Sequence, residues 1–79
     1  MTHRTEWSHW TNGGRFEMKV RAIGGSPYFD LYFNGFLLAT YLSPATAIQD
    51  VKNGLHDAKL GFGGSACNLP NSLGAWSNL

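Results

Sequence analysis

Strict alternation of apolar and polar residues marks positions 15–22. Because successive side chains of a β-strand point to opposite faces, this pattern predicts a strand with one buried and one exposed face. The apolar positions are Phe16, Met18, Val20 and Ala22, and the charged positions are Arg15, Glu17, Lys19 and Arg21. Gly24-Gly25-Ser26-Pro27 then breaks the pattern, which predicts a turn into the next strand.

Residues 28–44 predict a β-hairpin that runs directly into a helix. Its turn is Asn34-Gly35, because both central residues of a type I′ turn need positive φ angles, which Asn tolerates and Gly adopts freely. The expected pairs are Phe33 with Phe36, Leu31 with Leu38 and Phe29 with Thr40. We expect an inward face of Phe29, Leu31, Phe33, Phe36 and Leu38, and an outward face of Tyr28, Asp30, Tyr32, Leu37, Ala39 and Tyr41.

The amino-terminal segment predicts a further strand, joined to the first by Asn12-Gly13. With a two-residue turn, the pairs are Thr11 with Gly14, Trp10 with Arg15, His9 with Phe16, Trp7 with Met18 and Glu6 with Lys19. This register is favourable because it sets opposite charges across from each other and an aromatic ring beside a cation. Gly14 also permits a three-residue loop, which would shift the register. On this strand Trp7 is expected in the core and Trp10 at the surface.

A helix of about ten residues is expected after the hairpin. Ser43 is a good N-cap, and Pro44 suits the first helical position because its φ is preset and it lacks an amide proton. Asn53-Gly54 predicts the left-handed stop, and Leu55 fits the apolar residue that often follows. The positions expected to pack on the inward sheet face repeat at helical spacing and are Ala47, Ile48 and Val51.

The remaining chain predicts a tail of loops. Residues 60–67 are expected to form a loop, and residues 69–79 a loop or a single helical turn opened by Ser72. The apolar residues that would dock this tail are Leu69, Leu73, Trp76 and Leu79. The expected fold is α+β: an antiparallel meander of three or four strands packed on one α-helix. The 79 residues have room for one domain, with residues 1–4 frayed and residues 61–79 forming the Gly-rich loop and docked tail.

From the amino-acid composition, we expect part of the surface to be covered. Hydrophobic residues make up 43% of the chain, enough for a collapsed core. Charged residues make up 14%, against about 25% in typical soluble domains, which favours a surface occupied by a partner or by a second copy. The net charge of +1 lacks the strongly basic balance of most nucleic-acid-binding domains.

Neither a disulfide nor a membrane segment is expected. Cys67 is the single cysteine, so no internal disulfide can form. The first six residues are not followed by the apolar stretch of a signal peptide, and no window approaches the roughly 18 apolar residues of a membrane span. We therefore expect a cytoplasmic protein with no membrane partner.

The strongest candidate for function is the outward face of the sheet. Aromatic side chains interleaved with Arg and Lys suit the binding of single-stranded nucleic acids, because the bases stack on the rings and the phosphates pair with the cations. The same residue types are enriched at protein-binding hot spots. Alternatively, the tail around Trp76 or a second subunit covers this face, and Glu17 and Asp30 on it would repel phosphates. The candidate binding residues are Trp10, Arg15, Lys19, Arg21, Tyr28, Tyr32, Leu37 and Tyr41.

Other patterns give weaker candidates. The glycines before Ser65 lack the Gly-Lys-Ser/Thr of a phosphate-binding loop, so a flexible connection is favoured. His3, His9, His56 and Cys67 show no metal-ligand spacing, and nothing near Cys67 in sequence would activate a thiol. We therefore expect no cofactor, no metal and no enzymatic activity.

These patterns favour a small non-enzymatic binding protein (an adaptor, inhibitor or accessory factor) that acts through its aromatic sheet face. Its expected partner is another protein or its own copy. One alternative is a nucleic-acid-binding module, whose contacts would come from Arg15, Lys19 and Arg21 together with Tyr28, Tyr32 and Tyr41. The other alternative is a self-associating structural protein whose sheet face or edge pairs with a second copy.

Overall fold

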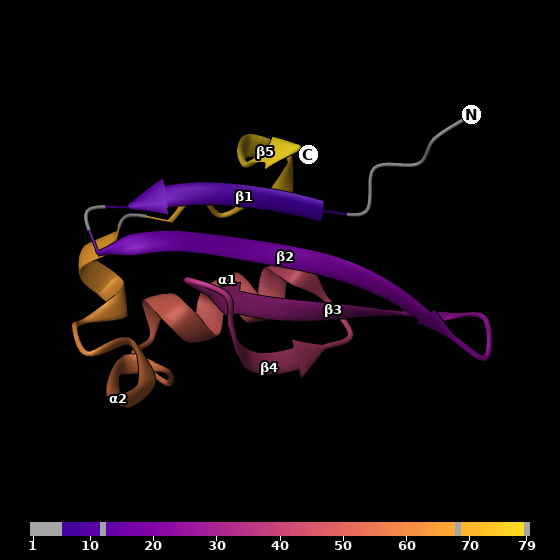
Figure 1. Ribbon diagram of the computed structural model, residues 1–79, viewed down its shortest axis with the longest axis horizontal. Helices are drawn as coiled ribbons and strands as arrows, with labels where there is room; N and C mark the ends of the chain where they lie inside the picture. Colours follow the sequence, from indigo (N-terminus) through magenta and orange to yellow (C-terminus); the bar gives the residue numbers. More distant parts are fainter. Residues whose placement is uncertain (1–5, 12, 68, 79) are drawn as a thin grey trace.

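A computed structural model of the protein describes residues 6–11, 13–67 and 69–78. The strands are β1 (Glu6–Thr11), β2 (Gly14–Ile23), β3 (Ser26–Phe33), β4 (Phe36–Tyr41) and β5 (Ser77–Asn78), and the helices are α1 (Pro44–Lys52) and α2 (Asp57–Leu60). Two short 3-10 turns, η1 (Gly64–Cys67) and η2 (Leu73–Ala75), lie in the tail. The α+β class is confirmed, with a meander of β1 to β4 and one longer helix (Figure 1).

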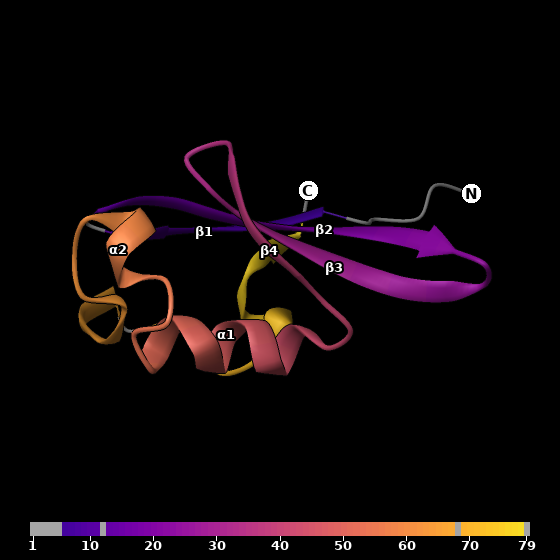
Figure 2. The same ribbon diagram turned by 90° about the horizontal axis from the view of Figure 1, so that it is seen from below.

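The described strands form one antiparallel sheet in the order β4-β3-β2-β1-β5. Helix α1 lies along one face of this sheet (Figure 2), and β5 brings the carboxy-terminal tail back to the free edge of β1 (Figure 1). No described helix lies over the opposite face (Figure 2). None of the described helices is long and apolar enough to cross a membrane.

The β1–β2 register follows the two-residue turn. Thr11 lies opposite Gly14 and Trp10 opposite Arg15, and the same ladder continues to Glu6 and Lys19. Asn12 itself and the expected fraying of residues 1–4 lie outside the described residues. Trp7 packs against the core and Trp10 is 70% exposed, so the predicted division between these two tryptophans is confirmed.

The β3–β4 hairpin contains a β-bulge that the sequence pattern did not predict. Phe33 pairs with Phe36 as expected, but Leu31 lies opposite Ala39 rather than Leu38, which is the extra residue. An added residue reverses the alternation beyond it. Ala39 and Tyr41 therefore lie opposite the inward-facing Leu31 and Phe29, and Tyr41 packs against the core, so the prediction that these two residues face outward is wrong.

Two further expectations for β4 are also wrong. Thr40 was expected to pair with Phe29, but it lies opposite Asp30 and its hydroxyl donates to Asp30 Oδ1 at 2.7 Å. Phe36 was expected in the core and is 76% exposed. It lies on the edge strand at the hairpin tip, which rises away from α1 (Figure 2), while Phe33 is packed by Phe16 and Phe62 instead.

Helix α1 begins and ends where the sequence predicts. Ser43 is the N-cap, although its side chain makes no capping bond, and Pro44 opens the helix. Gly54 has φ 88°, and the Leu55 N–H donates to the Asp50 carbonyl to close the last turn. Leu55 is exposed, so its expected apolar contact is not formed. The residues of α1 that are buried against the sheet are Ala47, Ile48 and Val51, as predicted.

The tail is more ordered than a loop and docks on the α1 side of the sheet. The region expected to be a loop over residues 60–67 contains the end of α2 and all of η1. Ser72 opens a single turn as predicted, and its Oγ accepts from the Gly74 N–H at 3.2 Å. Leu69 and Trp76 are buried in the core cluster, so the described part of the tail does not cover the outward sheet face. Leu79 lies outside the described residues.

Candidate interaction surface

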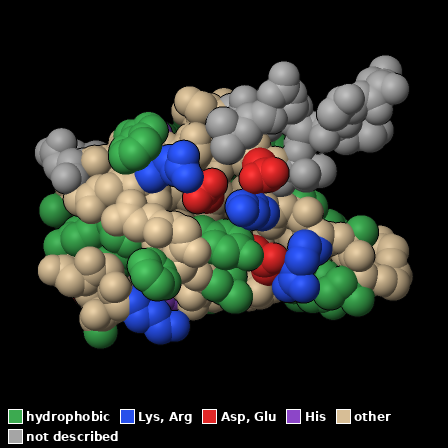
Figure 3. All heavy atoms as spheres, viewed as in Figure 1, with side chains coloured by type: hydrophobic (Ala, Val, Ile, Leu, Met, Phe, Trp, Pro, Cys, Tyr) green, Lys and Arg blue, Asp and Glu red, His purple; other side chains and the backbone are tan. Residues whose placement is uncertain are grey.

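The sheet face opposite α1, here called the open face, carries most of the predicted binding residues. Its members alternate with the core residues along the four longer strands. They are Glu6, Ser8 and Trp10 of β1, Arg15, Glu17, Lys19 and Arg21 of β2, Tyr28, Asp30 and Tyr32 of β3, and Leu37 and Thr40 of β4. Seen face on, acidic and basic side chains form a mixed band with hydrophobic groups beside it (Figure 3).

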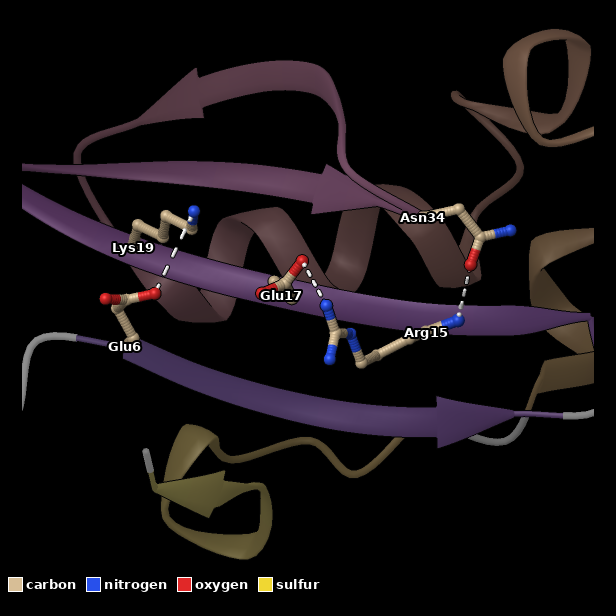
Figure 4. Close-up of polar contacts among 5 residues, drawn as sticks. All are labelled: Glu6, Arg15, Glu17, Lys19 and Asn34. Carbon is tan, nitrogen blue, oxygen red and sulfur yellow. Dashed lines mark hydrogen bonds and ion pairs between the residues drawn. The ribbon is translucent and has the colours of Figure 1, made fainter.

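Each cation of the open face is paired with a carboxylate of the same face. Arg15 Nη2 lies 3.2 Å from Glu17 Oε1, and Lys19 Nζ lies 3.8 Å from Glu6 Oε1 (Figure 4). Arg21 binds Asp30 through two contacts, Nε to Oδ2 at 2.5 Å and Nη2 to Oδ1 at 3.0 Å. The face therefore neutralises its own charge.

Asp30 is the most firmly held of these charges. Its side chain is nearly inaccessible, with a residue exposure of 3%, although it lies on the open face. The hydrogen bond from Arg21, supported by the one from Thr40, lowers the pKa of the Asp30 carboxyl despite the opposing effect of burial. The same bond raises the pKa of the Arg21 guanidinium. Asp30 therefore stays ionised and fixes the direction of Arg21.

Two of the cations also lie over aromatic rings. Arg15 lies 5.6 Å from the ring centre of Trp10, and Lys19 Nζ lies 4.9 Å from that of Tyr32. A cation over a ring is attracted to the negative face of the π-system. One face of the Trp10 ring is therefore covered by Arg15, and one face of the Tyr32 ring by Lys19, both from the adjacent strand β2.

Asn34, in the turn between β3 and β4, is hydrogen-bonded to Arg15 at the start of β2. Its backbone N–H donates to the Arg15 carbonyl at 2.9 Å, and its Oδ1 accepts from the Arg15 N–H at 2.9 Å (Figure 4). Asn34 has φ 49°, the positive value expected in this turn. The turn residue thus extends the β2–β3 ladder by one step and sets the position of Arg15.

The structure brings together the predicted binding residues of the first three strands and Leu37. Tyr41 is separated from them, because the bulge turns it to the α1 side. Its hydroxyl donates to Asp50 Oδ2 at 2.8 Å and lies 2.6 Å from Nε2 of His56. The hydroxyl has one proton, which is used toward Asp50, so the imidazole donates to it through Nε2–H. Burial raises the pKa of Tyr41 and lowers that of His56.

One feature of this surface could not be predicted from the sequence. Beside Leu37 lies a hollow of about 320 Å³, here called the tip hollow, between the buried Leu38 and its exposed predecessors Phe36 and Leu37. Lys59 of α2 reaches this hollow and donates from Nζ to the Leu38 carbonyl at 3.1 Å. The residues that line it are Phe33, Phe36, Leu37, Leu38 and Lys59.

The described residues contain no group of three His, Cys, Asp or Glu side chains placed to hold a metal ion. Burial raises the pKa of the Cys67 thiol, and His9 lies beside the Trp76 ring at 6.0 Å. His3 lies outside the described residues. A search of protein-family models, curated proteins and solved structures finds nothing that matches this chain. The role of the open face is therefore argued from its own chemistry.

Proposed function

We propose that this chain is a small non-enzymatic, cytoplasmic binding protein that covers part of a protein partner with its open face. The observation that carries the proposal is a sheet face that no described element covers, with exposed Trp10 and Leu37 and with every cation on it already paired. Trp, Tyr and Arg are the residues that contribute most energy to protein interfaces. An adaptor, an inhibitor or an accessory factor would all use the face in this way.

Charge pairing favours a protein partner over a nucleic acid. A phosphate backbone is bound by cations that release counterions on contact. Here a phosphate would have to displace Glu17 from Arg15 or Asp30 from Arg21, and would meet both carboxylates on the same face. The rings of Trp10 and Tyr32 each have one face taken by a cation, which also limits base stacking.

The paired charges of the open face lie mainly on the central strands β2 and β3, with exposed Trp10 on β1 and Leu37 on the edge strand β4 beside them. Protein interfaces combine aromatic anchors with hydrogen-bonded charges in this way. Ion pairs that are already formed are presented as a fixed pattern, so a partner with the complementary pattern needs no rearrangement of this chain. We infer that the pairs set the orientation of the partner, while Trp10, Tyr32 and Leu37 supply contact area.

The test is capture of ligands from a lysate of the source cells, with the bound material classified as protein or nucleic acid. We expect a protein whose capture changes little between low and high salt. It should be lost with a Trp10→Ser/Tyr32→Ser variant and kept with a Leu42→Ser/Leu55→Ser variant, because those leucines are exposed but lie outside the open face. Recovery of nucleic acid with a steep salt dependence would contradict the proposal.

A second copy of the chain is the competing occupant of the open face. Sedimentation equilibrium at two protein concentrations separates this case from a different partner. We expect one monomer mass at both concentrations, because the proposal assigns the face to another protein. A mass that rises with concentration, and that the Trp10→Ser/Tyr32→Ser variant returns to monomer, would instead assign the face to self-association.

A further inference from the structure

The tip hollow has the chemistry of a small apolar site with one positive charge. Its walls come from Phe33, Phe36, Leu37 and Leu38, and its polar group is the Lys59 ammonium. It lies next to the bulge, whose extra residue, Leu38, forms one of its walls. Phe36 and Leu37 are exposed at its rim, by 76% and 53%.

The charge of Lys59 is unmatched, in contrast to the cations of the open face. No carboxylate of the described residues lies within ion-pair distance of its Nζ, which bonds to the Leu38 carbonyl. Asp57, two residues earlier on α2, is used elsewhere, since its Oδ1 accepts from the Gly64 N–H at 2.7 Å. An ammonium has three donors, so Lys59 keeps capacity for an incoming acceptor.

We propose that the tip hollow receives one aromatic or long aliphatic side chain of the protein partner, with a neighbouring Asp or Glu of that partner paired to Lys59. This rests on the proposed function, because Leu37 belongs both to the hollow and to the open face, so one partner reaches both. A free small molecule fits less well. Ligand pockets bury most of their ligand, whereas this hollow has an exposed rim that a larger partner would cover.

Selection of a random peptide library on the immobilised full chain tests the inference by charge reversal. The wild type is expected to enrich peptides with an apolar residue next to Asp or Glu. A Lys59→Glu variant is expected to replace that acid with Lys or Arg. A Lys52→Glu variant is the matched control, since Lys52 lies on α1 and is bonded to Asn71, and it should select the same peptides as the wild type.

Amide chemical-shift mapping with one enriched synthetic peptide locates its site. Shifts are expected at residues 33–38 and at Lys59, with binding at least fivefold weaker for Phe36→Ser and for a peptide in which the acid is replaced by its amide. Thermal melting checks that each variant folds. If Lys59→Glu does not fold, Lys59→Met replaces it, and the preference for acidic peptides should then disappear.

Three results would overturn the inference: no enrichment of acidic peptides, the same peptides selected by Lys59→Glu, or shifts that map elsewhere. Shifts centred on Trp10 and Tyr32 would reject the hollow and leave the proposed function standing. Conversely, a captured partner that ignores the Trp10→Ser/Tyr32→Ser variant but loses affinity with Phe36→Ser would reject the open face and keep the hollow.

Discussion

At the scale of single residues, two phenylalanines that face each other across one turn have opposite environments. Phe33 is 8% exposed, with the Phe16 ring 4.8 Å and the Phe62 ring 5.5 Å from its own ring. Phe36, its partner in the ladder, is exposed at the sheet edge. Alternation alone assigns both to the core. The difference arises from Phe62, a residue far along the chain, which packs beside Phe33.

Replacement of each phenylalanine by alanine is expected to separate these environments. Phe33→Ala should lower the free energy of unfolding by about 3–5 kcal/mol, because it leaves a cavity between two aromatic rings. Phe36→Ala should change it by less than about 1 kcal/mol, as surface substitutions usually do. Urea denaturation of the two variants measures both values. Equal losses would show that Phe36 is buried, and that the hairpin has a different register.

A second prediction at this scale concerns pH and His56. Burial lowers the pKa of His56 in the folded chain, although the carboxylates of Asp50 and Asp57 oppose this effect. The unfolded chain therefore takes up a proton near its ordinary pKa of about 6.5, while the folded chain takes it up at lower pH. Protonation of His56 therefore favours the unfolded chain, and the free energy of unfolding falls as the pH drops below about 6.5.

Melting temperatures at pH 7.5 and 5.5 measure this effect. The wild type should lose more thermal stability over that interval than His56→Gln, whose amide can still donate to the Tyr41 hydroxyl but cannot take up a proton. The difference between the two chains removes the contribution of all other titrating groups. A wild type that loses no more stability than His56→Gln would show that His56 titrates alike in both states.

At the scale of elements, the sequence pattern correctly predicted the features that depend on residues close together in the chain. The β1–β2 register follows from the turn and from favourable pairs such as Trp10 with Arg15, and α1 follows from Ser43-Pro44 and the apolar spacing. The candidate face was largely predictable for the same reason, since alternation along β2 and β3 assigns each side chain to one face. These elements obey rules that operate over a few residues.

The bulge at Leu38 could not be predicted in this way, and it changes the candidate site. The sequence Phe36-Leu37-Leu38-Ala39 is apolar throughout, so its pattern does not distinguish a regular strand from one with an extra residue. The bulge moved Tyr41 to the core side, and its extra residue, Leu38, lines the tip hollow. The choice is made by contacts between distant parts of the chain, including the bond from Lys59 to the Leu38 carbonyl.

The tail is held against α1 by close approach of η1, which gives a prediction at the same scale. A Cβ at Gly64 would lie 2.1 Å from the Val51 carbonyl oxygen, whereas a Cβ at Gly63 would meet nothing within 4 Å. Gly64→Ala should therefore destabilise the fold by about 1–3 kcal/mol or more, since backbone must shift to admit the methyl group. Gly63→Ala should be near neutral. Denaturation of the two variants measures this, and matching stabilities would show that η1 does not pack on α1.

At the scale of the whole molecule, the two sheet faces are covered to different extents. One is covered by α1 and by the buried Leu69 and Trp76 of the tail. The other has no described element over it, and it keeps exposed Trp10 beside a set of ion pairs that neutralise one another. The open face thus presents exposed apolar groups together with charges that are already paired within the chain.

The central claim is that this open face binds a protein, and the dissociation constant of the purified complex tests it most directly. The Trp10→Ser/Tyr32→Ser variant should bind the captured partner at least tenfold more weakly than the wild type, about 1.4 kcal/mol. The Leu42→Ser/Leu55→Ser variant, which also removes two exposed apolar groups, should match the wild type. Unchanged affinity for the open-face variant, with its melting temperature preserved, would contradict the account.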